Sequence, residues 1–203
     1  EFRHDVLEAL RQPLEDGFIT VSRAAATATY PAEFVLVAAM NPCPCGNYGS
    51  RIHPCRCSRT QIEKYRGRIS GPLLDRIDIQ IEMPEVGFGE LSDKSGGEPS
   101  GEVRARVERA RERQRERFKN DGILVNAQMN ARLIKQYCSP DKASEQLLQR
   151  AYAELKLSAR AYQRILKVAR TIADVEGLEQ VQLSHYAEAI QYRSLDATTG
   201  RDA

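Results

Sequence analysis

FVLVAAMNPCPCG, residues 34–46, is the most informative segment of this 203-residue chain. Its first seven residues, 34–40, are all apolar. A continuous apolar run of this length favours a strand that is buried on both faces, as in a parallel sheet covered by helices. Asn41 and Pro42 end the run, and the prolines and glycines that follow favour a loop. We therefore expect a buried strand that leads directly into a cysteine-rich loop.

The loop has the composition of a metal site. Cys43 and Cys45 are followed, after nine residues, by Cys55 and Cys57. Four thiolates suit tetrahedral Zn²⁺, and a metal would replace the apolar core that this loop lacks. The C-x-C spacing is tighter than the usual C-x-x-C knuckle, and His53 is an alternative ligand. Four reduced thiols, or two disulfides, are the alternatives to zinc.

The flanking segments predict a mixture of helices and strands. Residues 1–16 have the apolar spacing of a helix, and residues 18–21 and 27–30 predict an antiparallel hairpin. Downstream, residues 59–66 favour a short helix. Residues 77–81 place isoleucine at every second position, which is typical of a strand.

Composition divides the chain in two. Residues 87–102 hold five Gly, three Ser and one Pro, which predicts a flexible linker. We expect one domain over residues 1–86 and an all-helical domain over residues 103–197. Residues 198–203 are expected to form a disordered tail.

Helix caps can be assigned within the second domain. Ser139, Ser158 and Ser184 each precede an apolar helical pattern, as N-cap residues do, and Gly177 follows one. The first helix, residues 103–119, carries eight Lys or Arg against three Glu. It forms either a solvated, salt-bridged helix or a contact to DNA phosphates, through a stripe of Arg106, Arg109, Arg113 and Arg117.

Bulk properties exclude several classes of protein. Hydrophobic residues make up 41% and charged residues 29%, as in an ordinary globular protein. No apolar run approaches the roughly 20 residues of a membrane-spanning helix, and the first residues do not resemble a signal peptide. We therefore expect a cytoplasmic protein without a membrane partner. A net charge of +2 does not by itself indicate a polyanion.

Three segments together carry a resemblance to a known family. They are residues 34–46, residues 65–78 (YRGRISGPLLDRID) and residues 157–174 (LSARAYQRILKVARTIAD). In this order and spacing they closely resemble ComM/YifB proteins, which are magnesium-chelatase-like AAA+ ATPases. They resemble more loosely the magnesium-chelatase ATPase subunits and the minichromosome-maintenance helicases.

The resemblance implies a fold and a function. The fold class would be α/β, with residues 1–86 forming the latter part of an AAA+ core and residues 103–197 a helical lid. The parent would be an ATP- and Mg²⁺-dependent homo-oligomeric ring, a hexamer, that remodels DNA in recombination or transformation. Its phosphate loop, G-x-x-x-x-G-K-[ST], does not occur in these 203 residues. The chain is therefore expected to be the C-terminal half of the ATPase and inactive alone.

The same resemblance assigns catalytic roles to two residues. Asn41 matches the sensor-1 position, where an amide orients the attacking water. Arg76 matches the arginine finger that a neighbouring subunit supplies, and Arg68 is its rival. From the residues alone, Asn41 is a loop asparagine before proline, and Arg76 is an ion-pair partner of Asp75 or Asp78; only the resemblance favours the catalytic roles.

Two further arginines receive binding roles. Arg160 matches the sensor-2 position, where a lid residue contacts nucleotide, with Arg164 and Arg170 as rivals. The alternative is a solvated helix arginine. Arg23 is the only cation at the predicted hairpin tip, and in the related helicases such a hairpin can touch DNA. The alternative for Arg23 is an ordinary surface residue.

Two other functions remain open. The chain could be a non-catalytic, zinc-stapled DNA-binding module, or the subunit of a true magnesium chelatase. The second has difficulty explaining the four-cysteine insert.

Overall fold

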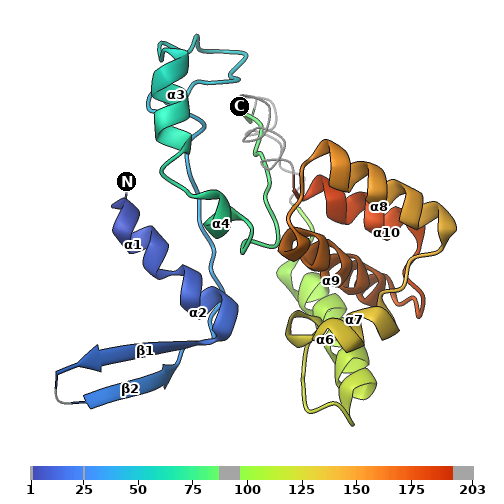
Figure 1. Ribbon diagram of the computed structural model, residues 1–203. Coiled ribbons are helices and arrows are strands. Elements are labelled where there is room, and N and C mark those ends of the chain that lie inside the picture. Colours follow the sequence, from blue (N-terminus) through green and yellow to red (C-terminus); the bar gives the residue numbers. More distant parts are fainter. Residues whose placement is uncertain (1, 25, 87–96, 194–203) are drawn as a thin grey trace. The chain divides into compact units, whose positions relative to one another are not determined.

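The computed structural model describes residues 2–24, 26–86 and 97–193, and the chain divides into two compact units. The first unit extends to Ile77 and the second begins at Asp78. Among the described residues, no helix is both long enough and apolar enough to cross a membrane. Each unit is described separately below (Figure 1).

Two short helices, α1 (His4–Ala9) and α2 (Arg11–Asp16), open the first unit. The single helix predicted over residues 1–16 is therefore interrupted at Leu10. Pro13 explains the break, because it has no N–H to donate and its ring crowds the carbonyl four residues earlier. Gly17, at φ +71°, then ends α2 in the left-handed conformation.

The predicted hairpin is confirmed. Strand β1 (Phe18–Arg23) pairs antiparallel with β2 (Ala26–Pro31), with Phe18 opposite Pro31 and Arg23 opposite Ala26. Successive side chains of a β-strand point to opposite faces, so the hairpin has two faces. One face carries Ile19, Val21, Ala28 and Tyr30, and the other carries four hydroxyl residues, Thr20, Ser22, Thr27 and Thr29. The two strands extend closer to the tip than predicted, and Arg23 ends β1.

The two other predicted strands are not found in the described residues. Residues 34–40 form neither strand nor helix, and the side chains of Val35 and Val37 are 88% and 89% exposed. Residues 77–81 contribute only an isolated bridge from Gln80 to Arg193. The prediction is wrong here because a strand needs a hydrogen-bonded neighbour along its length. Among the described residues, residues 34–40 have no strand partner, and residues 77–81 have only the Gln80 bridge, at which the Gln80 N–H donates to the Tyr192 carbonyl. The first unit thus contains helices and one two-stranded sheet.

Helices α3 (Arg59–Arg66) and α4 (Gly71–Leu74) complete the first unit. The range of α3 is the predicted one. Ser58 caps it, since its hydroxyl accepts the Gln61 N–H while the Gln61 side chain accepts the Ser58 N–H. Ser70 caps α4 through its hydroxyl, which accepts the Leu73 N–H.

The second unit is helical around one hydrophobic core. Its core includes Phe118, Leu133, Leu148, Ile165 and Tyr186, all at most 2% exposed. Helix α9 packs against α6, η1, α7 and α10, so its broad apolar face is covered by four neighbours. The elements are α6 (Ser100–Phe118), η1 (Asn126–Gln128), α7 (Ala131–Tyr137), α8 (Lys142–Glu154), α9 (Ala159–Glu176) and α10 (Leu183–Gln191).

Two of the predicted caps are confirmed and two are wrong. Ser158 caps α9 by accepting the Ala161 N–H, and Gly177 ends α9 at φ +84°. Ser139 does not cap α8. Asp141 does so instead, because its carboxylate accepts the Ser144 N–H at 2.8 Å.

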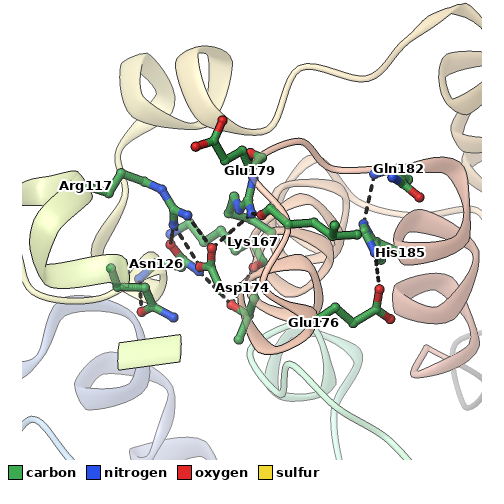
Figure 2. Close-up of polar contacts among 12 residues, drawn as sticks. Arg117, Asn126, Lys167, Asp174, Glu176, Glu179, Gln182 and His185 are labelled. Carbon is green, nitrogen blue, oxygen red and sulfur yellow. Dashed lines mark hydrogen bonds and ion pairs between the residues drawn. The ribbon is translucent and has the colours of Figure 1, made fainter. Parts of the chain in front are cut away.

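Ser184 lies inside α10 rather than before it. The N-cap of α10 is Gln182, whose N–H donates to Nδ1 of His185 at 2.9 Å, so Nε2 carries the proton and donates to Glu176. Figure 2 shows His185 between these two partners.

Helix α6 begins at Ser100, three residues before its predicted start, after Pro99 as N-cap residue. The last residues of the predicted linker are therefore helical. Residues 97–99 of that linker are described and are not helical, while residues 87–96 and the predicted tail, 198–203, lie outside the described residues.

Candidate functional site

The four clustered cysteines of the first unit bring their sulfurs together. The Sγ atoms of Cys43 and Cys45 are 3.4 Å apart, and each lies 3.7 Å from the Sγ atom of Cys55. With Cys57 included, all four sulfurs lie within 4.8 Å of one another. Zn–S bonds of about 2.3 Å at tetrahedral angles place sulfurs about 3.8 Å apart. The separations therefore fit a four-sulfur metal site and are too long for disulfides, and all four thiols are free.

Local turns create this convergence. Gly46, at φ +81°, donates its N–H to the Cys43 carbonyl and reverses the chain between Cys43 and the rest of the loop. On the return path, the Ser50 hydroxyl accepts the N–H groups of Ile52 and His53. His53 itself is exposed and lies outside the ligand cluster, so the four cysteines are the complete donor set among the described residues.

The electrostatics of the cluster favour a bound cation. Backbone N–H groups of Arg56 and Asn47 donate toward the Cys45 sulfur and lower the pKa of that thiol to about 6. Desolvation, together with the neighbouring sulfurs, raises the pKa of Cys57 to about 12. Without a counter-ion, ionisation of one thiol thus disfavours ionisation of its neighbours. A dication would remove that conflict by stabilising all of them.

Helix α3 is attached to the loop at both of its ends. Its N-cap, Ser58, directly follows Cys57. At its other end, Arg66 donates from Nε to the Pro42 carbonyl at 3.1 Å, and its guanidinium carbon lies 4.9 Å from the centre of the Tyr48 ring. Sequence reasoning missed Arg66, because neither spacing nor composition indicates a partner 24 residues away.

The structure places the two predicted catalytic residues in the same unit. Asn41 is exposed and precedes Cys43 by two residues. Arg76 follows α4, and its side chain is only 9% exposed. Its Nε atom lies 3.0 Å from Oε2 of Glu15, and its Nη1 atom donates to the Pro72 carbonyl at 2.5 Å. Arg76 therefore has an ion-pair partner within its own unit, on α2.

Comparison with known proteins gives two successive family matches. Residues 1–91 match the family model described as magnesium chelatase, subunit ChlI, and residues 97–193 match the one described as magnesium chelatase, subunit ChlI C-terminal.

This chain belongs to the magnesium chelatase ChlI family.

Individual relatives cover almost all of the chain. It is 46% identical to the competence protein ComM of Haemophilus influenzae over 96% of its own length, and 45% identical to YifB of Salmonella typhimurium over 97%. A protein of Mycobacterium tuberculosis is 37% identical over 97%. The chain spans only 37%, 38% and 39% of these three relatives, respectively.

In this member of the ChlI family, the predicted lid arginine Arg160 lies in the first turn of α9 and is exposed. Its two rivals are held in other contacts. Arg164 donates to the Asp78 carboxylate at 2.5 Å, and Arg170 is buried at 2% exposure. The guanidinium of Arg170 donates to the carbonyls of Leu178 and Glu179. Arg170 is thus part of the core of the helical unit.

A buried ionic network joins α6, η1 and α9 in the same unit. Asp174, 1% exposed, accepts from both Nη atoms of Arg117 and from Nδ2 of Asn126, as Figure 2 shows. Arg170 lies 3.0 Å from the same carboxylate, and its burial lowers the pKa of its guanidinium. Two arginines therefore share one carboxylate in a region of low dielectric, which makes Asp174 the central member of the network.

Sequence reasoning assigned these residues differently. Arg117 was one of four members of the basic stripe, but its side chain points into the network. The missed signal was the position of Arg170 and Asp174 on the apolar face of α9. They follow Leu166 at four-residue spacing, where a charged residue requires a buried partner.

Proposed function

We propose that this chain is part of an ATP-driven AAA+ motor of the ChlI family that acts on DNA in the cytoplasm. The observation that carries the proposal is the succession of the two family matches along almost the whole chain. A competence protein among the relatives supports DNA as the substrate, since competence is a process that handles DNA. The magnesium chelatase description keeps a metal-inserting subunit as the second candidate.

The proposed motor works as a homo-oligomeric ring, which we expect to be a hexamer binding ATP and Mg²⁺. Asn41 would orient the attacking water within its own subunit, and Arg76 would stabilise the transferred phosphate in the next one. Arg160 would contact nucleotide from the lid. Arg23, which ends β1 at the tip of an exposed hairpin, would contact DNA phosphates.

The phosphate loop is assigned to a part of the protein outside these 203 residues. The exposed apolar run of residues 34–40 supports this assignment, because Val35 and Val37 have the side chains of a buried strand. We infer that neighbouring strands of the same ATPase core cover them.

Phosphate release tests the motor. The full-length protein should hydrolyse ATP in a protein-dependent manner, and DNA should raise the rate. The 203-residue chain alone should show no turnover above background, because it lacks the residues that hold the phosphates. Turnover by this chain alone would contradict the proposal. A full-length rate raised by a porphyrin-bearing partner, and not by DNA, would favour the chelatase.

We further propose that Cys43, Cys45, Cys55 and Cys57 bind one structural Zn²⁺. The donor set is four sulfurs at tetrahedral separations, which leaves no open position for a substrate. By cross-linking the loop, the metal would stabilise a segment whose apolar side chains are largely exposed. Its function would therefore be to shape residues 42–58.

Metal analysis tests this site. Elemental analysis should find about one zinc per chain, and Co²⁺ in its place should give the absorption of a four-thiolate site. Cys45→Ser should weaken binding, since it removes one of four ligands. Cys138→Ser serves as the control, because Cys138 is buried in the helical unit, outside the cluster. A reduced, folded protein without metal would contradict the assignment.

A further inference from the structure

We propose that Arg66 couples the metal centre to Asn41, so that the metal positions a residue of the ATPase site as well as its own loop. The inference rests on the proposed zinc site. It goes beyond that proposal because it assigns Arg66 as a positioning residue and gives the four cysteines a regulatory consequence for the motor.

The contacts of one guanidinium carry the inference. Nε of Arg66 donates to the carbonyl of Pro42, the residue between Asn41 and the first cysteine ligand. The same guanidinium lies over the ring of Tyr48, which belongs to the loop between Cys45 and Cys55. Arg66 therefore contacts the chain just before the ligands and the loop that the ligands enclose.

Together with the backbone, these contacts form a closed path through the metal site. The chain runs from Pro42 through the four cysteines to Cys57, enters α3 at Ser58 and returns to Pro42 through Arg66. Within the loop, the turn at Gly46 and the hydrogen bonds around Ser50 are local, and the four sulfurs are the contacts that join its two ends. A change in metal occupancy would therefore move both the Pro42 carbonyl and Tyr48, and Asn41 is attached directly to Pro42.

An arginine suits this position for a physical reason. Its planar guanidinium can donate in its plane to a carbonyl while one face stacks on an aromatic ring. The ammonium group of lysine can donate to the carbonyl or approach the ring, but lacks the planar face that does both. Arg66→Lys should accordingly retain part of the coupling, and Arg66→Gln should lose it.

The C-terminal end of α3 also links Arg66 to the predicted arginine-finger segment. Gly67 follows Arg66, and Arg68 follows in turn as the rival arginine finger. Holding Arg66 against Pro42 thus fixes the spacing between Asn41 and the start of the arginine-bearing segment. A merely structural Arg66 would stabilise α3 equally with or without metal, so the distinguishing observable is the metal dependence itself.

Hydrogen exchange of the full-length protein, with Co²⁺ as the probe metal, tests the coupling. In the wild-type protein, removal of Co²⁺ by a chelator should speed amide exchange in the loop, at Asn41 and at residues 66–68. We expect about a tenfold change outside the loop, the factor that a hydrogen bond with a charged donor supports. In Arg66→Gln, the cobalt spectrum should persist while exchange at Asn41 no longer responds to the metal.

Lys64→Gln is the matched control, because it removes one positive charge from the same turn of α3 at an exposed position. It should behave like the wild type. The coupling is overturned if cobalt binds but protects residues 43–57 only, or if Arg66→Gln leaves the response at Asn41 intact. Absence of any cobalt spectrum overturns the metal site itself, and the coupling with it.

Discussion

In the full-length protein, Arg76→Ala is expected to lower the rate of ATP hydrolysis about a thousandfold while leaving nucleotide binding largely intact. A finger supplied in trans interacts with the transition state more than with the ground state, so its loss appears mainly in the rate. The expected change corresponds to roughly 4 kcal/mol of barrier. Steady-state phosphate release and nucleotide titration measure the two quantities separately.

The ion pair of Arg76 with Glu15 provides the control for this experiment. A finger must leave Glu15 in order to reach a neighbouring nucleotide, whereas a structural arginine acts through Glu15. Glu15→Gln removes the charge of the partner and keeps its size. If Arg76 is the finger, Glu15→Gln should retain most of the hydrolysis rate. Equal losses in the two variants would show that Arg76 acts by joining α2 to the segment after α4.

Mixed rings separate the roles of the two subunits. Asn41→Ala should also slow hydrolysis, but through its own subunit. Rings that contain both Asn41→Ala and Arg76→Ala subunits hold some interfaces with an intact Asn41 facing an intact Arg76, and these should regain activity. If mixed rings assemble but stay inactive, the trans assignment is wrong, and Arg68 is the next residue to test.

Asp174→Ala is expected to lower the free energy of unfolding of the helical unit by about 3–5 kcal/mol, because it breaks a buried ionic network by removing one partner. Asp174 accepts from Arg117 and Asn126, and Arg170 lies against the same carboxylate. Alanine would leave the two guanidinium groups close together without their shared anion. Chemical denaturation followed by far-ultraviolet circular dichroism measures the effect.

Two further variants make this result interpretable. A loss of this size approaches the roughly 5–15 kcal/mol stability of a whole domain, so Asp174→Ala can fail to fold. Asp174→Asn keeps the size and one acceptor oxygen, and should give a smaller but measurable loss. Glu112→Ala breaks the exposed pair with Arg115 and should cost at most about 1 kcal/mol. Similar losses for Asp174→Asn and Glu112→Ala would contradict a central role for Asp174.

Local rules account for the parts of the fold that were predicted correctly. The hairpin follows from alternation along its two strands, α3 from its capping box, and the ends of α9 from Ser158 and Gly177. Each of these depends on residues only a few positions apart. Pro13 was also visible in the sequence, and its effect on the first helix was underestimated.

The candidate sites also have a part that was predictable from the sequence and a part that was not. The convergence of the cysteines was predictable, because C-P-C and C-R-C each hold their two sulfurs close and the short loop can join them. The partners of the functional arginines were not predictable. Arg66 contacts Pro42, Arg76 contacts Glu15 and Arg117 contacts Asp174, across separations of 24 residues for the first pair and 57 for the last.

Residue order was enough to predict the family, helix α3, the helical character of the second unit, the hairpin and the cysteine cluster, because each rests on a motif or on short-range hydrogen bonds and turns. The folded arrangement was needed to learn which arginines lie in the core, which carboxylates they share and which apolar run has no strand partner among the described residues. The physical reason is that ion pairs and sheet ladders form between groups brought together by folding. Their free energy depends on burial and separation in space, and the order of residues along the chain specifies neither directly.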